Sequence, residues 1–593
     1  MLRQKTLFQS IASLWGHLQR RRQIQFFMLL VMMLLSSMAE MLSIGAVVPF
    51  LSALVNPEKV FNHVSARSFI VLFSIDRPQD ILFPLTAIFC VAALVAGLFR
   101  LALLYAITRF SFMVGADFSI DVYRRTLYQP YSVHSRRNSS EIINGITGKV
   151  AMLVGSVLMP LLTLTSSTIL LVGVLWMLLL IDPVIALVAG SSFGFLYVIT
   201  ALISRRSLRE NSECIAREST RVIKALQEGL GGIRDVLVDG TQEAYCVIYR
   251  NADLPLRRAQ GRNAFVSASP RYIMEMLGMI MIAVLAYNMA QSEGGVGAAL
   301  PVLGALALGA QRLLPVLQQG YNALATIFGA EASMRDGLEL LAQPMPKQFG
   351  DKLAPPLPFT RAIRLEGISF RYSADSAWIL RDVNLEIPKG KRVGFVGTTG
   401  AGKSTLLDML MSLLTPSEGV MLIDGQAVGE HNYRNWQAHI AHVPQSIYLS
   451  DSSVAENIAF GLPRKEIDPE RVRQAAKQAQ IDDVIESLPE KYQTTVGERG
   501  VRMSGGQRQR IGIARALYKR ADVIIFDEAT SALDNETENA VMQAIDSLSP
   551  DLTILIVAHR TTTLQKCDFI VEIDNGRILR IGSYQEIAND SQA

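Results

Sequence analysis

The stretch Gly397-Thr398-Thr399-Gly400-Ala401-Gly402-Lys403-Ser404 decides the fold of the second half of the chain. It follows the strand-like run 392–396 and has the residue spacing of a phosphate-binding loop, after which a helix should begin. The glycines let backbone N–H groups turn toward phosphates, Lys403 reaches the outer phosphates, and the Ser404 hydroxyl is placed to bind Mg²⁺. The positive end of the helix faces the anion. This half is predicted to be an α/β domain that binds a nucleotide, with Thr405 included in the site.

Two acidic residues end a second apolar run. The run 523–526 (VIIF) predicts a strand buried on both faces, which brings Asp527 and Glu528 to its carboxyl end, where open α/β sheets bind ligands. We expect Asp527 to hold Mg²⁺ and Glu528 to orient or deprotonate the attacking water. In isolation such a pair is as often a solvated turn or a helix N-cap. The order of the surrounding motifs favours catalysis.

The pentapeptide Met503-Ser504-Gly505-Gly506-Gln507, between these two motifs, resembles the signature of the ATP-binding cassette (ABC) family, with Met503 where Leu is usual. The resemblance extends to other motifs in family order. It implies adenine stacking by Tyr372, sensing of Mg²⁺ and water by Gln445, a dimer-interface segment ending at Asp534, and contact of His559 with the outermost phosphate. Residues 495–500 resemble the loop that distinguishes exporters in this family.

The resemblance also implies an assembly. In the family, the signature of one subunit caps the ATP held by the phosphate loop of another, so one copy of each motif per chain predicts a dimer. Because Glu528 is present and no motif is visibly degraded, both sites should hydrolyse ATP, which favours a homodimer. The alternative from another class is a nucleotide-gated regulator or channel that does not use hydrolysis. Glu528 and His559 argue against it.

Composition indicates a chain of two parts. Of its 593 residues, 50% are hydrophobic, too many for a purely soluble protein, and 19% are charged, too many for one wholly in lipid. The net charge of +4 implies no nucleic-acid partner. The four cysteines show no paired or metal-ligand spacing and are predicted to be reduced thiols; they are Cys90, Cys214, Cys246 and Cys567.

Hydropathy predicts six membrane spans in the first 330 residues. They run at about 24–53, 81–107, 157–181, 184–204, 272–289 and 297–328. The polar stretches after spans two and four are rich in Arg and Lys, whereas the turn 182–183 and the loop 292–295 have none. The positive-inside rule therefore places both termini and these stretches in the cytoplasm.

The organisation predicted from these features is a membrane domain at 1–340, a proline-rich linker at 341–360 and a nucleotide-binding domain at 361–593. The two long polar stretches have helical character and resemble the cytoplasmic extensions of ABC exporters. We expect their tips near 131–138 and 239–245. The fold class is thus an all-α membrane domain of six spans with long cytoplasmic helices, joined to an α/β phosphate-loop ATPase.

Ionisable residues within the spans bear on the substrate. Arg100, Arg271 and Arg312 lie in spans two, five and six, and such groups usually face a cavity or a partner. The membrane half resembles the bacterial lipid-linked oligosaccharide flippases of the PglK type, including a short external apolar stretch at 69–73. In that family, cavity arginines act on the lipid diphosphate, to which guanidinium groups are well suited. The alternative is that Glu40 and Glu275 neutralise these arginines as structural ion pairs.

The sequence therefore predicts a homodimeric ABC exporter that uses ATP and Mg²⁺. We expect it to flip a polyprenyl-diphosphate saccharide across a bacterial inner membrane, in contact with membrane lipids. The runner-up is an exporter of other lipids, glycolipids or amphipathic drugs, which would need a roomy apolar cavity rather than a basic one.

Overall fold

The computed structural model of the protein describes residues 7–55, 57–62, 67–73, 75–181, 183–290, 313–345, 355–528, 534–546, 551–558 and 564–590. The chain forms two compact units. The helical unit comprises Met1–Gln129 and Arg137–Met345, and the sheet unit comprises Pro130–Arg136 and Pro346–Ala593.

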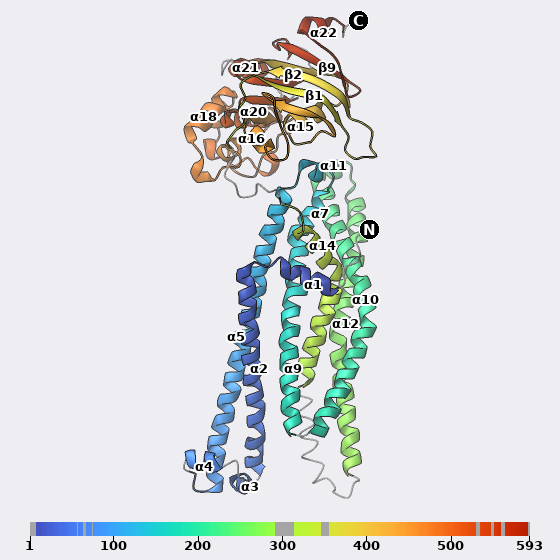
Figure 1. Ribbon diagram of the computed structural model, residues 1–593, viewed down its shortest axis with the longest axis vertical. Coiled ribbons are helices and arrows are strands. Elements are labelled where there is room, and N and C mark those ends of the chain that lie inside the picture. Colours follow the sequence, from blue (N-terminus) through green and yellow to red (C-terminus); the bar gives the residue numbers. More distant parts are fainter. Residues whose placement is uncertain are drawn as a thin grey trace. The chain divides into compact units, whose positions relative to one another are not determined.

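The described part of the helical unit is made of helices (Figure 1). They are α1 (Leu7–Gly16), α2 (Arg20–Val55), α3 (Pro57–Phe61), α4 (Arg67–Leu72), α5 (Leu82–Leu127), α7 (Ser139–Asn144), α8 (Val150–Met152), α9 (Met159–Ile181), α10 (Pro183–Gly231), α11 (Ile233–Val238), α12 (Gln242–Ala290) and α14 (Glu331–Leu341), with a further helical stretch at 313–329. A 3-10 helix, η2 (Pro78–Ile81), precedes α5, and two π-helical turns, η3 (Gly145–Lys149) and η4 (Leu153–Leu158), flank α8.

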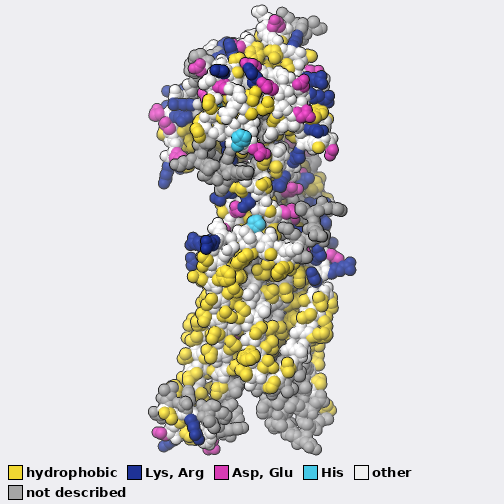
Figure 2. Space-filling view, in the orientation of Figure 1, with side chains coloured by type: hydrophobic (Ala, Val, Ile, Leu, Met, Phe, Trp, Pro, Cys, Tyr) yellow, Lys and Arg dark blue, Asp and Glu magenta, His cyan; other side chains and the backbone are white. Residues whose placement is uncertain are grey.

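The long helices exceed the thickness of a membrane. At a rise of about 1.5 Å per residue, the 49 residues of α10 or α12 extend about 74 Å, more than twice the ~30 Å hydrocarbon core. Figure 2 shows hydrophobic side chains covering much of the helical unit, with Lys and Arg gathered beside this apolar surface. The helices therefore continue well past the apolar region, as the predicted cytoplasmic extensions require.

Three segments of the described chain are long and apolar enough to cross a membrane: Arg20–Ala46, Pro78–Leu127 and Ser139–Met177. They cover most of the first three predicted spans. The predicted spans 184–204, 272–289 and 297–328 each include positions outside the described residues or side chains. Where they are described, these spans are helical, in α10, α12 and 313–329.

Glycines set the packing of α14 on the π-helical segments. A Cβ atom at Gly337 of α14 would lie 2.6 Å from Leu153 Cδ1 of η4, and one at Gly145 of η3 would lie 2.6 Å from Leu340 Cδ1 of α14. Both distances are shorter than a Cβ atom tolerates, so a side chain at either position would require the facing leucine side chain to shift. Glycine at these two positions allows α14 to pack closely where the helix widens.

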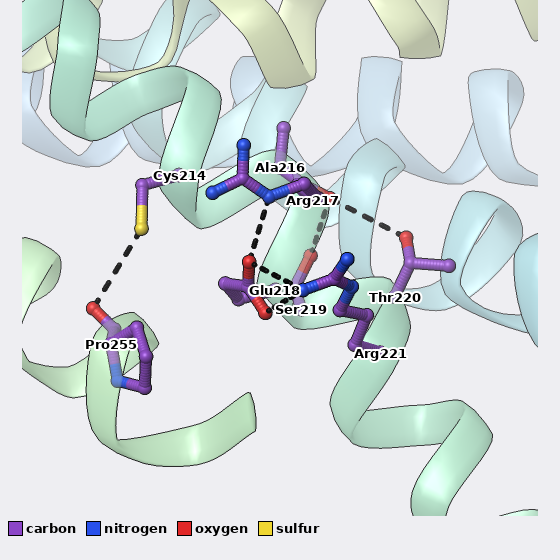
Figure 3. A network of polar contacts seen from close by, with 8 residues as sticks. All are labelled: Cys214, Ala216, Arg217, Glu218, Ser219, Thr220, Arg221 and Pro255. Carbon is purple, nitrogen blue, oxygen red and sulfur yellow. Dashed lines mark hydrogen bonds and ion pairs between the residues drawn. The ribbon is translucent and has the colours of Figure 1, made fainter. Parts of the chain in front are cut away.

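A buried carboxylate organises the middle of α10 (Figure 3). Glu218 is only 3% exposed and accepts hydrogen bonds from Arg217 Nε at 2.7 Å and Arg221 Nη1 at 3.3 Å. Beside it, the Thr220 hydroxyl accepts a hydrogen bond from Asn144 Nδ2 at 2.9 Å. Asn144 ends α7, so this bond fastens α7 to α10. Paired guanidinium groups are what allow a carboxylate to be buried here.

The sheet unit contains two sheets. A four-stranded antiparallel sheet has the order β2-β1-β4-β5, and a six-stranded sheet has the order β10-β9-β3-β8-β7-β6, parallel except for the β9–β10 pair. The strands are β1 (Ala362–Phe370), β2 (Leu380–Pro388), β3 (Arg392–Val396), β4 (Glu418–Ile423), β5 (Gln426–Ala427), β6 (Ile440–Val443), β7 (Val523–Asp527), β8 (Thr553–Val557), β9 (Phe569–Asp574) and β10 (Arg577–Gly582).

Helices surround these sheets. They are α6 (Tyr131–His134), α15 (Lys403–Leu410), α16 (Tyr433–Gln437), α17 (Val454–Ile458), α18 (Pro469–Gln478), α19 (Asp482–Glu486), α20 (Gly505–Lys519), α21 (Asn535–Asp546) and α22 (Tyr584–Asp590), with 3-10 turns η5 (Arg464–Glu466), η6 (Lys491–Gln493) and η7 (Glu498–Gly500).

Two apolar cores cover the two faces of the parallel sheet, and β7 contributes to both. Val523 and Ile525 pack in the core shared with the antiparallel sheet, whereas Ile524 and Phe526 pack against α17, α18 and α20. The alternation of a strand puts successive side chains on opposite faces, so an unbroken apolar run is needed where both faces are covered. The apolar run predicted as a doubly buried strand is therefore β7.

Candidate functional site

The phosphate loop joins β3 to α15, and its glycines are required by the backbone. Gly397 has φ +151° and Gly402, which precedes the first residue of α15, has φ +101°. A Cβ atom at Gly397 would lie 2.1 Å from the carbonyl oxygen of Ile573 in β9. A residue with a side chain at this position would meet both a disfavoured φ and a collision. The loop therefore lies close against the end of β9.

Lys403 folds back onto the loop that precedes it. Its Nζ donates hydrogen bonds to the carbonyl oxygens of Gly397 at 2.7 Å and Thr398 at 3.0 Å, and the residue is only 9% exposed. Two carbonyl oxygens thus hold the ammonium group within the phosphate loop. Phosphate oxygens could accept the same hydrogen bonds. Ser404 beside it is exposed, and Thr405 is buried in the first turn of α15. These groups fit the predicted binding of nucleotide phosphates and Mg²⁺.

The acidic pair lies at the carboxyl end of β7, beside the loop. Burial raises the pKa of Asp527, the charge of Glu528 raises it further, and Lys403 opposes both. Glu528 has φ +51°, and its N–H donates to the carbonyl of Val557 at 3.0 Å. A non-glycine residue in this left-handed region is uncommon and often marks a functional position.

Gln445, which follows the end of β6, contacts the carboxylate of Glu528. Its Nε2 donates a hydrogen bond to Glu528 Oε2 at 2.6 Å. Because β6 and β7 are parallel neighbours, residues that follow them emerge at the same edge of the sheet. The structure therefore brings together Gln445, Asp527, Glu528 and Lys403, which are far apart in the sequence.

The signature pentapeptide forms the start of α20. Ser504 is the N-cap: its Oγ accepts from Gln507 N at 3.2 Å, while Gln507 Oε1 accepts from Ser504 N at 2.9 Å. Met503 belongs to the apolar core that also contains residues of α17 and α18, and it is 6% exposed. The N-terminal end of α20 therefore presents backbone N–H groups, which favour an anion, on a firmly anchored helix.

The other residues singled out from the sequence lie as follows. Tyr372 is 38% exposed, with its ring 5.1 Å from that of Phe370 in an edge-to-face contact. Asp534 accepts hydrogen bonds from Thr537 N at 2.9 Å and Thr537 Oγ1 at 2.8 Å. These bonds hold the pKa of the Asp534 carboxyl below its usual range. His559 and residues 531–533 lie outside the described residues.

Sequence reasoning did not identify the contact between Asn457 and Arg515. Arg515 of α20 donates from Nε to Asn457 O at 2.9 Å and from Nη2 to Tyr448 O at 3.0 Å, with its guanidinium 4.4 Å above the Phe460 ring. Asn457 is fully buried in α17, and its side chain bonds to Ser450 through both amide atoms. The helix that carries the signature is thereby tied to the segment that follows Gln445. No spacing rule in the sequence predicts this contact.

The described membrane arginines differ in their surroundings. Arg271 Nε donates to Glu275 Oε1 at 2.8 Å, one turn away on α12, with both side chains more than 40% exposed. Arg100 of α5 is exposed and forms no ion pair with the described residues. Arg312 lies outside the described residues. The pairing with Glu275 keeps the structural ion-pair alternative open for Arg271.

The stretch at 69–73 is mostly helical and lies near a cavity. It overlaps the end of α4, and a cavity of about 620 Å³ is lined by Phe73, Gln79 of η2 and Phe83 at the start of α5, among others. Phe83 is 81% exposed. This end of the α2–α5 hairpin therefore combines a hollow with exposed aromatic side chains.

Comparison with known proteins identifies relatives over both units. A family model described as ABC transporter matches residues 380–531, and one described as ABC transporter transmembrane region matches residues 24–299. An ATP-dependent lipid A-core flippase of Cupriavidus metallidurans is 32% identical over 514 residues, covering 84% of this chain and 83% of that protein. A protein of the same description from Saccharophagus degradans is 32% identical over 481 residues, or 79% of each chain.

One solved structure has a similar fold throughout. The structure of a bacterial Atm1-family ABC exporter with ATP bound superposes with a TM-score of 0.76 at 23% identity, covering 96% of this chain and 97% of that one. This likeness and the family matches confirm the predicted fold class, a helical membrane domain joined to an α/β phosphate-loop domain.

Proposed function

Because the chain belongs to the ABC transporter family, whose ATPase domain hydrolyses ATP to drive transport, we propose that it flips a lipid with a saccharide head group across a bacterial inner membrane. The observation that carries the substrate class is the likeness to relatives described as lipid A-core flippases, which extends over about four fifths of this chain. The exposed apolar surface of the helical unit supports a lipid-facing protein.

We assign the steps of hydrolysis to the groups at the edge of the parallel sheet. Lys403 would exchange the carbonyls of Gly397 and Thr398 for the outer phosphates of ATP. Glu528 would orient the attacking water or accept its proton, with its carboxylate held by Gln445. Ser404, Asp527 and Gln445 would hold Mg²⁺, which supplies positive charge to offset the charge on the phosphate oxygens. His559 would contact the outermost phosphate.

The proposal includes a homodimer in which each ATP is shared. The phosphate loop and Tyr372 of one chain would bind ATP, and Ser504, Gly505, Gly506 and Gln507 of the other would cap it. The exposed N-terminal end of α20, with its capping box, supports such a role, because unpaired helix N–H groups attract an anion. We place the sheet unit and both termini in the cytoplasm, following the distribution of Arg and Lys around the predicted spans.

At finer detail, we propose a polyprenyl-diphosphate saccharide as the substrate, with Arg100, Arg271 and Arg312 acting on the diphosphate. Guanidinium groups bind phosphate with paired hydrogen bonds. Of the three arginines, Arg100 lies in α5 and Arg271 lies in α12. The second candidate is a lipid A-core glycolipid, favoured by the description of the relatives. Both substrates combine acyl or prenyl chains with phosphates and sugars.

A reconstituted protein distinguishes these candidates. Purified protein in liposomes would be given either a polyprenyl-diphosphate saccharide or a lipid A-core glycolipid, and ATPase rate and head-group translocation would be measured together. If only the polyprenyl-diphosphate saccharide is flipped and stimulates the ATPase, the diphosphate proposal is supported. If only the lipid A-core glycolipid does so, the glycolipid is supported. If neither substrate changes either rate while ATPase activity is present, the proposed substrate class is wrong.

A further inference from the structure

The sheet unit contains a cavity at the amino-terminal ends of its parallel strands. The nucleotide motifs lie at the opposite, carboxyl ends of these strands. It has a volume of about 390 Å³ and lies between α18 and the last turn of α20, above Ile524 in β7 and Leu552, which precedes β8. Parallel strands place their amino-terminal residues at one edge and their carboxyl ends at the other. Ile524 is near the start of the strand that delivers Asp527 at its end, so this cavity is distinct from the ATP site.

The lining combines buried apolar side chains with the amides of Gln474 and Gln478 and with two arginines. Leu517, Ile524 and Leu552 are each less than 10% exposed, whereas Arg471 of α18 and Arg520 line the cavity as its two charged groups. None of the described residues that line it is acidic. Asp468, one turn before Arg471, is engaged as the N-cap of α18 by Glu470 N and Arg471 N. The charge of the cavity is therefore positive.

Arg471 is held in place but incompletely hydrogen bonded. Its guanidinium lies 4.5 Å above the Tyr518 ring, a cation–π contact that fixes the side chain. Its Nε is buried and has no hydrogen-bond partner among the described residues. A buried guanidinium N–H without an acceptor costs free energy, which an acceptor supplied by a ligand would offset.

Arg520 is the second arginine of the cavity and lies at the end of α20. It is the C-cap of α20 in a left-handed conformation, with φ +54° and ψ +47°. Its Nη2 makes one long contact, 3.5 Å to Gln474 Oε1, which leaves most of the five guanidinium donors available. Arg471 in α18 and Arg520 at the end of α20 thus line one cavity.

We propose that this cavity binds a small organic anion, with a carboxylate or phosphate between Arg471 and Arg520 and an apolar body against Leu517 and Ile524. Guanidinium groups match both anions in geometry, and the volume is within the ~300–1,000 Å³ usual for small-molecule sites. The occupant would contact the last turn of α20. The signature lies at the first turn of the same 15-residue helix, about 22 Å away. The site is independent of the transported substrate.

The test uses the full-length protein in lipid nanodiscs and isothermal titration with three six-carbon probes: hexanoate, hexyl phosphate and hexylammonium. We expect saturable binding of at least one anion and none of the cation. Arg471→Gln and Arg520→Gln should each weaken that binding at least tenfold. The matched control is Arg473→Gln, which removes a charge from the same helix but at an exposed residue paired with Glu486; it should bind as the parent does.

A saturating non-hydrolysable ATP analogue separates this cavity from the phosphate loop. Anion binding that persists with the analogue supports the proposal, and binding that it abolishes places the anion at the phosphate loop and overturns it. The proposal also fails if neither anion binds the parent protein, or if folded Arg471→Gln and Arg520→Gln variants bind with unchanged affinity. Arg520 is exposed at a turn, so its variant remains informative if Arg471→Gln does not fold. Whether hexanoate or hexyl phosphate binds more tightly identifies the preferred head group.

Discussion

The Nε2 atom of Gln445 lies 2.6 Å from Oε2 of Glu528, which joins the ends of two neighbouring strands through their side chains. In this arrangement the Gln445 amide donates to one oxygen of the carboxylate that we assign to the attacking water. Glu528→Gln should therefore keep ATP binding but slow hydrolysis at least ~100-fold, because the amide cannot accept the proton. Steady-state ATPase and nucleotide-binding assays check this, and near-normal turnover would remove Glu528 from the chemistry.

The backbone at Gly397 leads to a second prediction. Gly397→Ala should lower ATP affinity and destabilise the sheet unit by about 1–3 kcal/mol, since the new Cβ collides with Ile573 O at an unfavourable φ. Gly400→Ala is the matched control, because its φ is +86° but open space surrounds it. Thermal unfolding and ATP titration should show the larger loss for Gly397→Ala. Equal losses would mean that the collision with β9 is relieved.

A third prediction addresses the shared ATP site. Ser504→Arg should abolish hydrolysis by blocking the capped end of α20, and Lys403→Ala should abolish it by weakening phosphate binding. A mixed dimer of the two variants keeps one intact composite site. Co-purified mixtures should therefore show more ATPase activity than either variant alone. Activity no greater than either parent would mean that the two sites work only together or that ATP is not shared between chains.

The membrane arginines give a fourth prediction. Arg100→Ala and Arg271→Ala should each reduce flipping strongly while basal ATPase survives, through loss of a charge-assisted contact worth about 1.5–3 kcal/mol. Lysine replacements should restore flipping only in part.

Glu275→Gln is the control for Arg271, because it breaks the 2.8 Å pair but leaves the cation. If Arg271→Ala lowers folding yield, ATPase and flipping together, and Glu275→Gln does the same, the pair is structural. Well-folded Ala variants that flip at the parent rate would exclude the diphosphate contact.

A fifth prediction concerns pH and the start of β1. Partial burial tends to raise the pKa of Asp424, but hydrogen bonds from Thr360, Ala362 and Arg361 outweigh it and hold the pKa below its usual value. The stabilisation is thus present above the unfolded pKa of about 3.9 and is lost as pH falls through the folded value. Asp424→Asn should lower the melting temperature at pH 7, with a smaller difference at a pH below about 3.9. A difference that is the same at both pH values would assign the effect to packing.

Local patterns in the sequence predicted the parts of the fold that depend on neighbours in the chain. The phosphate loop, the doubly buried strand before Asp527 and the long helices follow from spacing and hydropathy over short windows. The π-helical segments η3 and η4 were not predicted, and they lie where α14 packs, at the close approach of Gly337 to Leu153. Likewise, the Arg515–Asn457 contact joins residues 58 positions apart, and only the folded backbone brings them together.

The Arg271–Glu275 pair follows from local spacing on a helix. The sequence raised both a cavity role and an ion pair for these residues, and a spacing of four on a helix makes the pair geometrically easy. The structure contains that pair, but the partial exposure of both side chains leaves the guanidinium accessible to a ligand. Arg271 is therefore both paired with Glu275 and open to a ligand.

Met503 contacts the core, while its neighbour Ser504 caps the exposed end of α20. Two consecutive residues therefore meet different physical requirements. At the first position, the core needs the volume and flexibility of a hydrocarbon-like side chain, so Met can replace Leu at little cost. At the second, the helix end needs a hydroxyl that accepts a hydrogen bond. A search pattern that demands Leu would miss this protein, whereas one that demands any large apolar residue followed by Ser-Gly-Gly-Gln would retain it.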